Sequence, residues 1–325
     1  MTINIIKDNS SSNSFIIRNF VHDKYNIHFS FNLKDYTSFL HELKNIGVNE
    51  IEHAASNIKY SSQEKRLKEV TNIIRDLGLV SVLYTGVFGV EDLKSNPSLL
   101  KYAQRSFKGD VLSFNGLRSA MMCPSSNYID EYSIPKVSSL LSLNTFDKVF
   151  IDIPWIMKGG CFCNNCYNGE IKKSNDESAR GGLEKFTNAL KLVKSDVKIS
   201  VNASAPTIHN NKYSGAHIDN LVGLFDEYVT EWNPYRWNQK STILKNCISY
   251  AKSKTNKDVF HATTLTNRKG ELYSKDEYVA LFKDIFNSGA NLRLGIGFSG
   301  ETLSFIGSAI TDSLKENSKN KNQTK

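Results

Sequence analysis

Three cysteines crowd into one short segment, Gly159-Gly-Cys161-Phe-Cys163-Asn-Asn-Cys166, and a fourth, Cys123, lies upstream. Thiolates are good zinc ligands, and a four-cysteine set forms a closed tetrahedral site that holds structure and leaves no position open for catalysis. The spacing therefore predicts a structural zinc site at Cys123, Cys161, Cys163 and Cys166. Reduced cysteines that pack a loop, or a single nucleophilic cysteine, are the alternatives. The spacing matches no ferredoxin-type iron–sulfur pattern.

Two carboxylates end apolar, strand-like runs and have aromatic residues beside them. Asp152 ends Val-Phe-Ile-Asp, and Glu231 ends Tyr-Val-Thr-Glu. Cleavage of a glycosidic bond needs two carboxyl groups, one to protonate the leaving oxygen and one to attack or stabilise the anomeric carbon. We predict Asp152 as nucleophile or stabiliser and Glu231 as general acid/base, with an ion pair or a helix N-cap as the structural alternative for each. Nearby aromatic rings would stack on a sugar: Trp155, Trp232 and Tyr235.

Further polar side chains stand at the expected carboxyl ends of other strands. We predict that they contact the substrate: Glu52, His53, Tyr84, Asn202, His261 and Arg293. Among them, His53 and His261 could bind sugar hydroxyls or move protons, and Asn202 and Arg293 could orient hydroxyl or anionic groups.

Short apolar runs alternate with amphipathic ones along the chain, as strands alternate with helices in βαβ folds. The runs predict strands at about 27–31, 50–53, 79–84, 148–153, 197–202, 227–231, 258–262 and 291–295. Helices are predicted at about 34–45, 64–77, 97–107, 135–144, 180–194, 217–224, 240–254, 275–288 and 301–316. Eight strand–helix units predict a (β/α)₈ TIM barrel, provided that the apolar run 111–114 belongs to an insertion. An open doubly wound sheet is the alternative, but no glycine-rich turn follows the first expected strand, where a nucleotide site would need one.

The domain organisation predicted from these patterns is a single barrel with two polar ends. Residues 1–25 would form a short N-terminal extension, residues 26–315 the barrel, and residues 316–325 a disordered tail. No internal repeat or linker marks a second domain.

The composition favours a globular protein that binds a small carbohydrate or an oligosaccharide. Hydrophobic residues make up 40% of the chain, and 41 Lys and Arg against 33 Asp and Glu give a net charge of +8. Basic residues do not alternate with aromatic ones as in a phosphate-binding groove, so we expect no nucleic-acid partner. The chain starts without the apolar stretch of a signal peptide, and it has no membrane-length apolar window. We expect a cytoplasmic location and no membrane contact; the sequence carries no signal of an oligomeric state.

The order of these motifs resembles one family of barrels. Cys123-Pro-Ser-Ser, a helix, a strand ending in Asp152, and the Cys161-x-Cys163-x₂-Cys166 loop are similar to the glycoside-hydrolase-like TIM barrels related to alpha-amylase-type hydrolases. The specific motifs cover about residues 79–235. The resemblance implies that Asp152 occupies the fourth-strand nucleophile position. The fifth strand departs from the pattern, because it ends in Asn202 where an amylase-type enzyme has its acid; Glu231 on the sixth strand would have to replace it.

The sequence leads to three interpretations of function. The first is an enzyme of the glycoside hydrolase type that uses Asp152 and Glu231. The second is a sugar or sugar-phosphate isomerase or lyase with Glu52 or His53 as base, for which the positive net charge would suit a phosphorylated substrate. The third is a barrel without catalytic activity that binds a glycan or a protein.

Overall fold

Eight parallel strands close into a barrel in the order β1-β10-β9-β8-β7-β6-β3-β2. The computed structural model describes residues 15–21, 31–54, 60–113, 116–143, 145–152, 154–157, 159–170, 172–203, 215–231, 241–295 and 300–323. The barrel strands are β1 Ile17–Phe20, β2 Glu50–Ala54, β3 Val80–Gly86, β6 Lys148–Asp152, β7 Lys198–Asn202, β8 Glu227–Glu231, β9 Asp258–Ala262 and β10 Asn291–Leu294. This closure confirms the predicted (β/α)₈ TIM barrel and excludes the open sheet.

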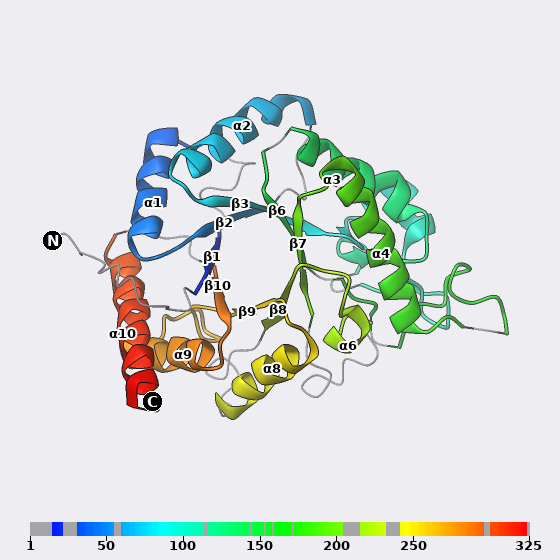
Figure 1. Cartoon of the computed structure of the whole chain (residues 1–325). Helices are drawn as coiled ribbons and strands as arrows, with labels where there is room; N and C mark the ends of the chain where they lie inside the picture. Colours follow the sequence, from blue (N-terminus) through cyan, green and yellow to red (C-terminus); the bar gives the residue numbers. More distant parts are fainter. Residues whose placement is uncertain are drawn as a thin grey trace.

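Helices surround the strands on all sides in Figure 1. They are α1 Leu33–Asn45, α2 Tyr60–Asp76, α3 Ile134–Ser142, α4 Asn175–Val193, α6 Ile218–Leu221, α8 Ser241–Lys254, α9 Lys275–Asn287 and α10 Glu301–Gln323. Capping boxes start α4 and α9: in α4 the Ser174 side chain accepts from the backbone N–H of Glu177, whose carboxylate accepts from Ser174 in return. Among the described helices, none is both long enough and apolar enough to cross a membrane.

The first strand was predicted wrongly. The strand that pairs with β2 and β10 is Ile17–Phe20, inside the segment expected as an extension, and not 27–31. Residues 22–30 lie outside the described residues. The strand is hard to predict because it is short and contains Arg18 and Asn19, residue types that are usually exposed to solvent but are fully buried here. At the other end, α10 continues to Gln323, beyond the expected helix end at 316.

Charged side chains meet inside the barrel near the amino-terminal ends of the strands, where Glu50, Lys148 and Glu227 begin β2, β6 and β8. Arg18 Nε lies 2.6 Å from Glu50 Oε2, and another of its nitrogens lies 2.5 Å from Glu227 Oε2. Lys148 Nζ forms ion pairs with the same two carboxylates. Each buried charge therefore faces opposite charges, which is the condition under which burial is tolerated. Apolar side chains lie in the interior as well: Val82, Phe150, Val229 and Phe260.

A long insertion separates β3 from α3. It contains the antiparallel pair β4 (Val90–Glu91) and β5 (Ala120–Met121), the 3₁₀ helix η2 (Pro97–Tyr102) and the π-helix η3 (Ile129–Ser133). The described part of the run 111–114 lies here and adds no barrel strand, as the count of eight units requires. A small separate core supports the insertion, with Leu93, Leu99, Tyr102, Met122 and Tyr128 among its members.

Candidate functional site

Asp152 lies at the carboxyl end of β6 and receives two hydrogen bonds from neighbouring strands. Tyr84 Oη, from β3, donates to Asp152 Oδ2 over 2.5 Å. Asn202 Nδ2, from β7, donates to Asp152 Oδ1 over 2.8 Å. Each carboxylate oxygen is therefore oriented by a donor, while the residue stays half-buried at the barrel mouth. Catalytic groups of TIM barrels lie at this end of the strands.

The Tyr84 phenol is a permanent donor in this arrangement. Burial, followed by the charge of Asp152 and the hydrogen bond to it, raises the pKa of Tyr84 far above its usual value. The phenol therefore keeps its proton and holds Asp152 in place.

Glu231 ends β8 and faces the same region. Asn202 Nδ2, which lies 2.8 Å from Asp152 Oδ1, lies 3.4 Å from Glu231 Oε2. These two carboxylate oxygens are thus no more than about 6 Å apart, and pairs of carboxyl groups in glycosidases are about 5–9.5 Å apart. Glu231 is exposed, whereas Asp152 is half-buried, so the two carboxylates have different environments.

Arg293, from β10, supplies a fixed positive charge to the site. Its guanidinium forms a two-pronged ion pair with the fully buried Glu52 of β2, with Nε 2.9 Å from Oε2. Burial disfavours the charged guanidinium, but Glu52 and Asp152 outweigh this effect and raise the pKa of Arg293. The guanidinium also lies 4.5 Å from the centre of the Phe150 ring. Glu52 is therefore the partner that holds Arg293.

The two histidines, His53 and His261, each contact a hydroxyl group of a neighbouring element. His53 Nε2 is 2.7 Å from the Tyr36 hydroxyl of α1, and complete burial lowers the pKa of His53 to about 3. His261 Nδ1 is 2.8 Å from Thr230 Oγ1, and His261 is also fully buried. Side chains alternate along a strand, so His53 points away from the interior that its neighbour Glu52 occupies. These contacts place His53 against α1 and His261 against Thr230 of β8.

The aromatic residues expected around the site are only partly described. Trp155 is half-buried and packs against the main core, and its carbonyl accepts a hydrogen bond of 3.2 Å from Gln104 Nε2. Trp232 and Tyr235 lie outside the described residues. Sequence reasoning missed Phe20, at the end of β1, whose ring centre is 4.9 Å from that of Tyr84. Recognition of β1 as a strand would have placed it there.

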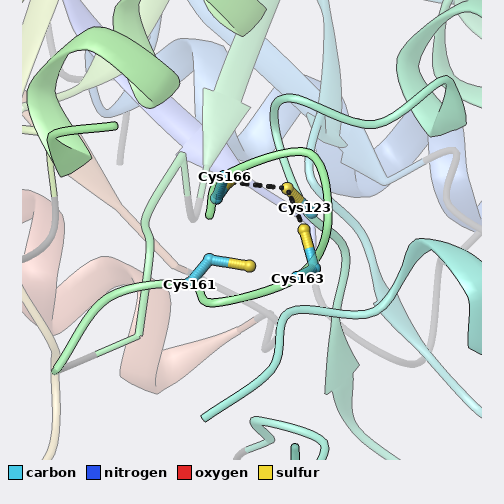
Figure 2. A group of neighbouring side chains, drawn as sticks. All are labelled: Cys123, Cys161, Cys163 and Cys166. Carbon is cyan, nitrogen blue, oxygen red and sulfur yellow. Dashed lines mark hydrogen bonds between the residues drawn. The ribbon is translucent and has the colours of Figure 1, made fainter. Parts of the chain in front are cut away.

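The four cysteines converge as the spacing predicts (Figure 2). Their sulfur atoms all lie within 4.8 Å of one another, with Cys123 Sγ 3.3 Å from Cys166 Sγ and 3.4 Å from Cys163 Sγ. Four sulfurs around one zinc ion at about 2.3 Å would be separated by about 3.8 Å. Hydrogen bonding with Cys123 and Cys161 lowers the pKa of Cys163 well below the ordinary thiol value and that of Cys166 to about 7. The donor set and its spacing fit a tetrahedral metal ion.

The cysteine cluster joins the insertion to the loop after β6. Cys123 follows β5, and the other three cysteines lie between β6 and α4. Gln104 connects the same two segments, because its amide donates to Met122 O and Trp155 O and accepts from the backbone N–H of Met157. The insertion and this loop therefore form one unit beside the barrel mouth.

No protein-family model and no curated protein matches this chain. Its barrel is similar to solved barrels of glycoside hydrolases. Alpha-L-fucosidase isoenzyme 2 from Paenibacillus thiaminolyticus matches with a TM-score of 0.68 at 15% identity, over 93% of this chain and 49% of the fucosidase. A GH36 alpha-galactosidase from Geobacillus stearothermophilus, solved in complex with stachyose, matches with a TM-score of 0.55 at 10% identity, over 93% of this chain and 42% of that enzyme. The chain thus spans about half the length of these proteins or less, and the likeness shows the fold.

Proposed function

We propose that the protein is a retaining glycoside hydrolase with Asp152 as nucleophile and Glu231 as general acid/base. The observation that carries the proposal is the Asn202 amide, which contacts both carboxylates and keeps their nearest oxygens within about 6 Å. Retaining enzymes separate their carboxyl groups by about 5–5.5 Å and inverting ones by about 6.5–9.5 Å. A bound of about 6 Å on one oxygen pair supports the shorter, retaining arrangement, and the anomeric configuration of the product tests it. The likeness of the barrel to those of a fucosidase and an alpha-galactosidase supports the same class of reaction.

The chemistry divides into two displacements at the anomeric carbon. Asp152 forms a bond to this carbon while the bond to the leaving oxygen breaks, and Glu231 gives its proton to that oxygen. Glu231 then takes a proton from water, whose oxygen displaces Asp152 and regenerates the enzyme. Tyr84 and Asn202 orient Asp152 through their hydrogen bonds, and exposed Glu231 has access to water.

The isomerase or lyase interpretation has weaker support from the geometry. Both bases considered for it are engaged: Glu52 pairs with Arg293, and His53 contacts Tyr36. The proposed hydrolysis needs neither residue as a base.

Incubation of the purified protein with a mixed oligosaccharide library, followed by mass spectrometry over time, tests the proposal. We expect products from the wild type and none from Asp152→Asn or Glu231→Gln. Glu170→Gln, which alters an exposed carboxylate of the cysteine loop, serves as matched control and should retain activity. Equal products from the wild type and both site variants would contradict the assignment. A folded wild type that binds glycans without cleaving any would favour the interpretation as a binding barrel.

We further propose that the cysteine cluster binds one structural zinc ion. The support is the four-sulfur donor set, with all sulfur atoms within 4.8 Å of one another. The ion would fix the insertion against the loop after β6 and would take no part in hydrolysis, since four thiolates leave no open position.

A further inference from the structure

A hollow lies beside the barrel mouth, and Asp152 is not among its described lining residues. It has a volume of about 850 Å³ and is bordered by α2, the end of β3, the insertion and α3. Sites for small ligands are typically about 300–1,000 Å³ with a few placed polar groups. The hollow is therefore large enough for a sugar unit.

Stacked tyrosines form one wall of this cavity. The rings of Tyr128 and Tyr132 lie 5.5 Å apart at an interplanar angle of 13°. Gly89 allows this arrangement, because it has a φ of +59° and any Cβ at its position would lie 2.6 Å from the Tyr128 hydroxyl. Tyr132 is 36% exposed, so part of its surface is open to a ligand. An aromatic face of this kind can stack on the CH face of a pyranose.

Carboxylates outnumber amines among the charged groups that line the cavity. Among its described lining residues, Glu64, Glu91 and Glu131 are acidic and only Lys136 is basic, although the chain as a whole carries a charge of +8. Glu91 accepts a hydrogen bond from Tyr128 Oη, and Glu131 accepts one from Tyr102 Oη, which orients both carboxylates. Carboxylates accept hydrogen bonds from sugar hydroxyls and repel anionic groups. Lys68 pairs with Glu64, and Lys101 Nζ lies 4.0 Å from Glu131 Oε2, so both carboxylates are partly neutralised from outside the lining. The lining itself still has more carboxylates than amines, which suits an uncharged sugar better than an acidic one.

Tyr84 links the cavity to the candidate catalytic site. It lines the cavity and also donates its hydroxyl hydrogen to Asp152. The same residue thus borders the cavity and contacts Asp152, which suits a single oligosaccharide that occupies both places.

We propose that this cavity binds an uncharged sugar unit of an oligosaccharide whose scissile bond lies at Asp152. The role of the cavity in substrate selection rests on the proposed hydrolase function. Sugar binding by the cavity can be measured without turnover. Tyr132 stacks on the sugar, and Glu91 and Glu131 accept hydrogen bonds from the hydroxyl groups of the sugar.

Glycan binding by the full-length Asp152→Asn protein separates this site from catalysis. The probe is an array of neutral oligosaccharides and of matched oligosaccharides that carry uronic or sialic acids, followed by titration of the strongest neutral binder. Tyr132→Ala should weaken that binding about tenfold, the loss expected for one stacked ring. Tyr167→Ala, which removes an aromatic ring of the cysteine loop, is the matched control and should bind like its parent.

Three results would overturn the proposal: no glycan bound, acidic glycans bound as tightly as neutral ones, or Tyr132→Ala binding equal to its parent. Circular dichroism of each variant shows that the fold is intact. Hydrolysis of a disaccharide by the wild type, lost in Asp152→Asn, would uphold the catalytic proposal even then. Conversely, Tyr132-dependent binding by a protein that cleaves nothing would uphold the cavity and refute the catalytic proposal.

Discussion

The hydrogen bonds to Asp152 give the most specific prediction at the scale of single residues. Tyr84→Phe removes the hydroxyl that donates to Asp152 Oδ2 and keeps the ring packed against Phe20 and Phe150. Hydrogen bonds to charged groups contribute about 1.5–3 kcal/mol, so we expect kcat to fall about 10- to 100-fold in a variant that still folds. Steady-state kinetics on the substrate found in the library measures this effect.

Tyr167→Phe is the matched control for that experiment. Its hydroxyl donates to the carbonyl of Gly169 in the cysteine loop, so the substitution deletes a hydroxyl away from Asp152. Undiminished kcat in Tyr84→Phe would show that Asp152 does not depend on this donor and would count against its role as nucleophile.

The insertion and the loop after β6 lead to a prediction about metal content. If one zinc ion joins the insertion to the loop after β6, the purified protein contains about one zinc per chain by elemental analysis. Cys161→Ser and Cys163→Ser should lose the metal and melt at lower temperature, because metal binding is coupled to folding of these loops. Cys247→Ala alters the buried cysteine of α8, outside the cluster, and should retain the metal.

A chelator provides an independent test of the same element. Removal of the ion should make residues 154–170 more accessible to limited proteolysis, and added zinc should restore protection. A protein that binds neither zinc nor cobalt with its thiols reduced would contradict the metal site.

The sequence predicted most elements because their patterns are local. Amphipathic periodicity marks α1, whose Tyr36, Phe39, Leu40 and Leu43 are buried, and α9, which was predicted at 275–288. The start of α4 was missed: the helix begins at Asn175, after the Ser174 cap, and not at the predicted residue 180. The strand β1 was missed because its burial depends on partners far along the chain. Arg18 forms ion pairs with Glu50 and Glu227, and no local sequence pattern predicts contacts between residues so far apart in the chain.

The candidate site was predicted as a set of strand ends, and its internal arrangement was not. Strand alternation decides which neighbour faces the interior, so Glu52 meets Arg293 whereas His53 meets Tyr36. A shift of one residue in the strand would reverse which of the two side chains faces the interior, and strand boundaries predicted from sequence are not accurate to one residue. The role of Asn202 between two carboxylates follows only from the three-dimensional closure of the barrel.

At the scale of the whole molecule, buried His53 predicts how stability depends on pH. Its pKa is lowered from 6.5 to about 3 in the folded state, so only the unfolded chain takes up its proton between these values. Stability due to this residue is therefore complete above about pH 6.5 and is lost as the pH falls towards 3, by up to about 1.4 kcal/mol per pH unit.

Comparison of the wild type with His53→Gln in urea unfolding from pH 7 to pH 4 measures this contribution. The free energy of unfolding of the wild type should fall more steeply, whereas His41→Gln, which replaces an exposed histidine of α1, should follow the wild type. Equal slopes for the wild type and His53→Gln would contradict the buried neutral histidine.

In the proposed mechanism, Asp152 forms a covalent bond to the sugar. Intact-mass spectrometry after incubation with activated 2-deoxy-2-fluoro glycosides tests it most directly, because such sugars slow the second displacement and allow the glycosyl-enzyme to accumulate. We expect one added sugar mass, located by peptide mapping on Asp152, and none in Asp152→Asn. An adduct on another residue, or hydrolysis with an inverted anomeric product and no adduct, would contradict it.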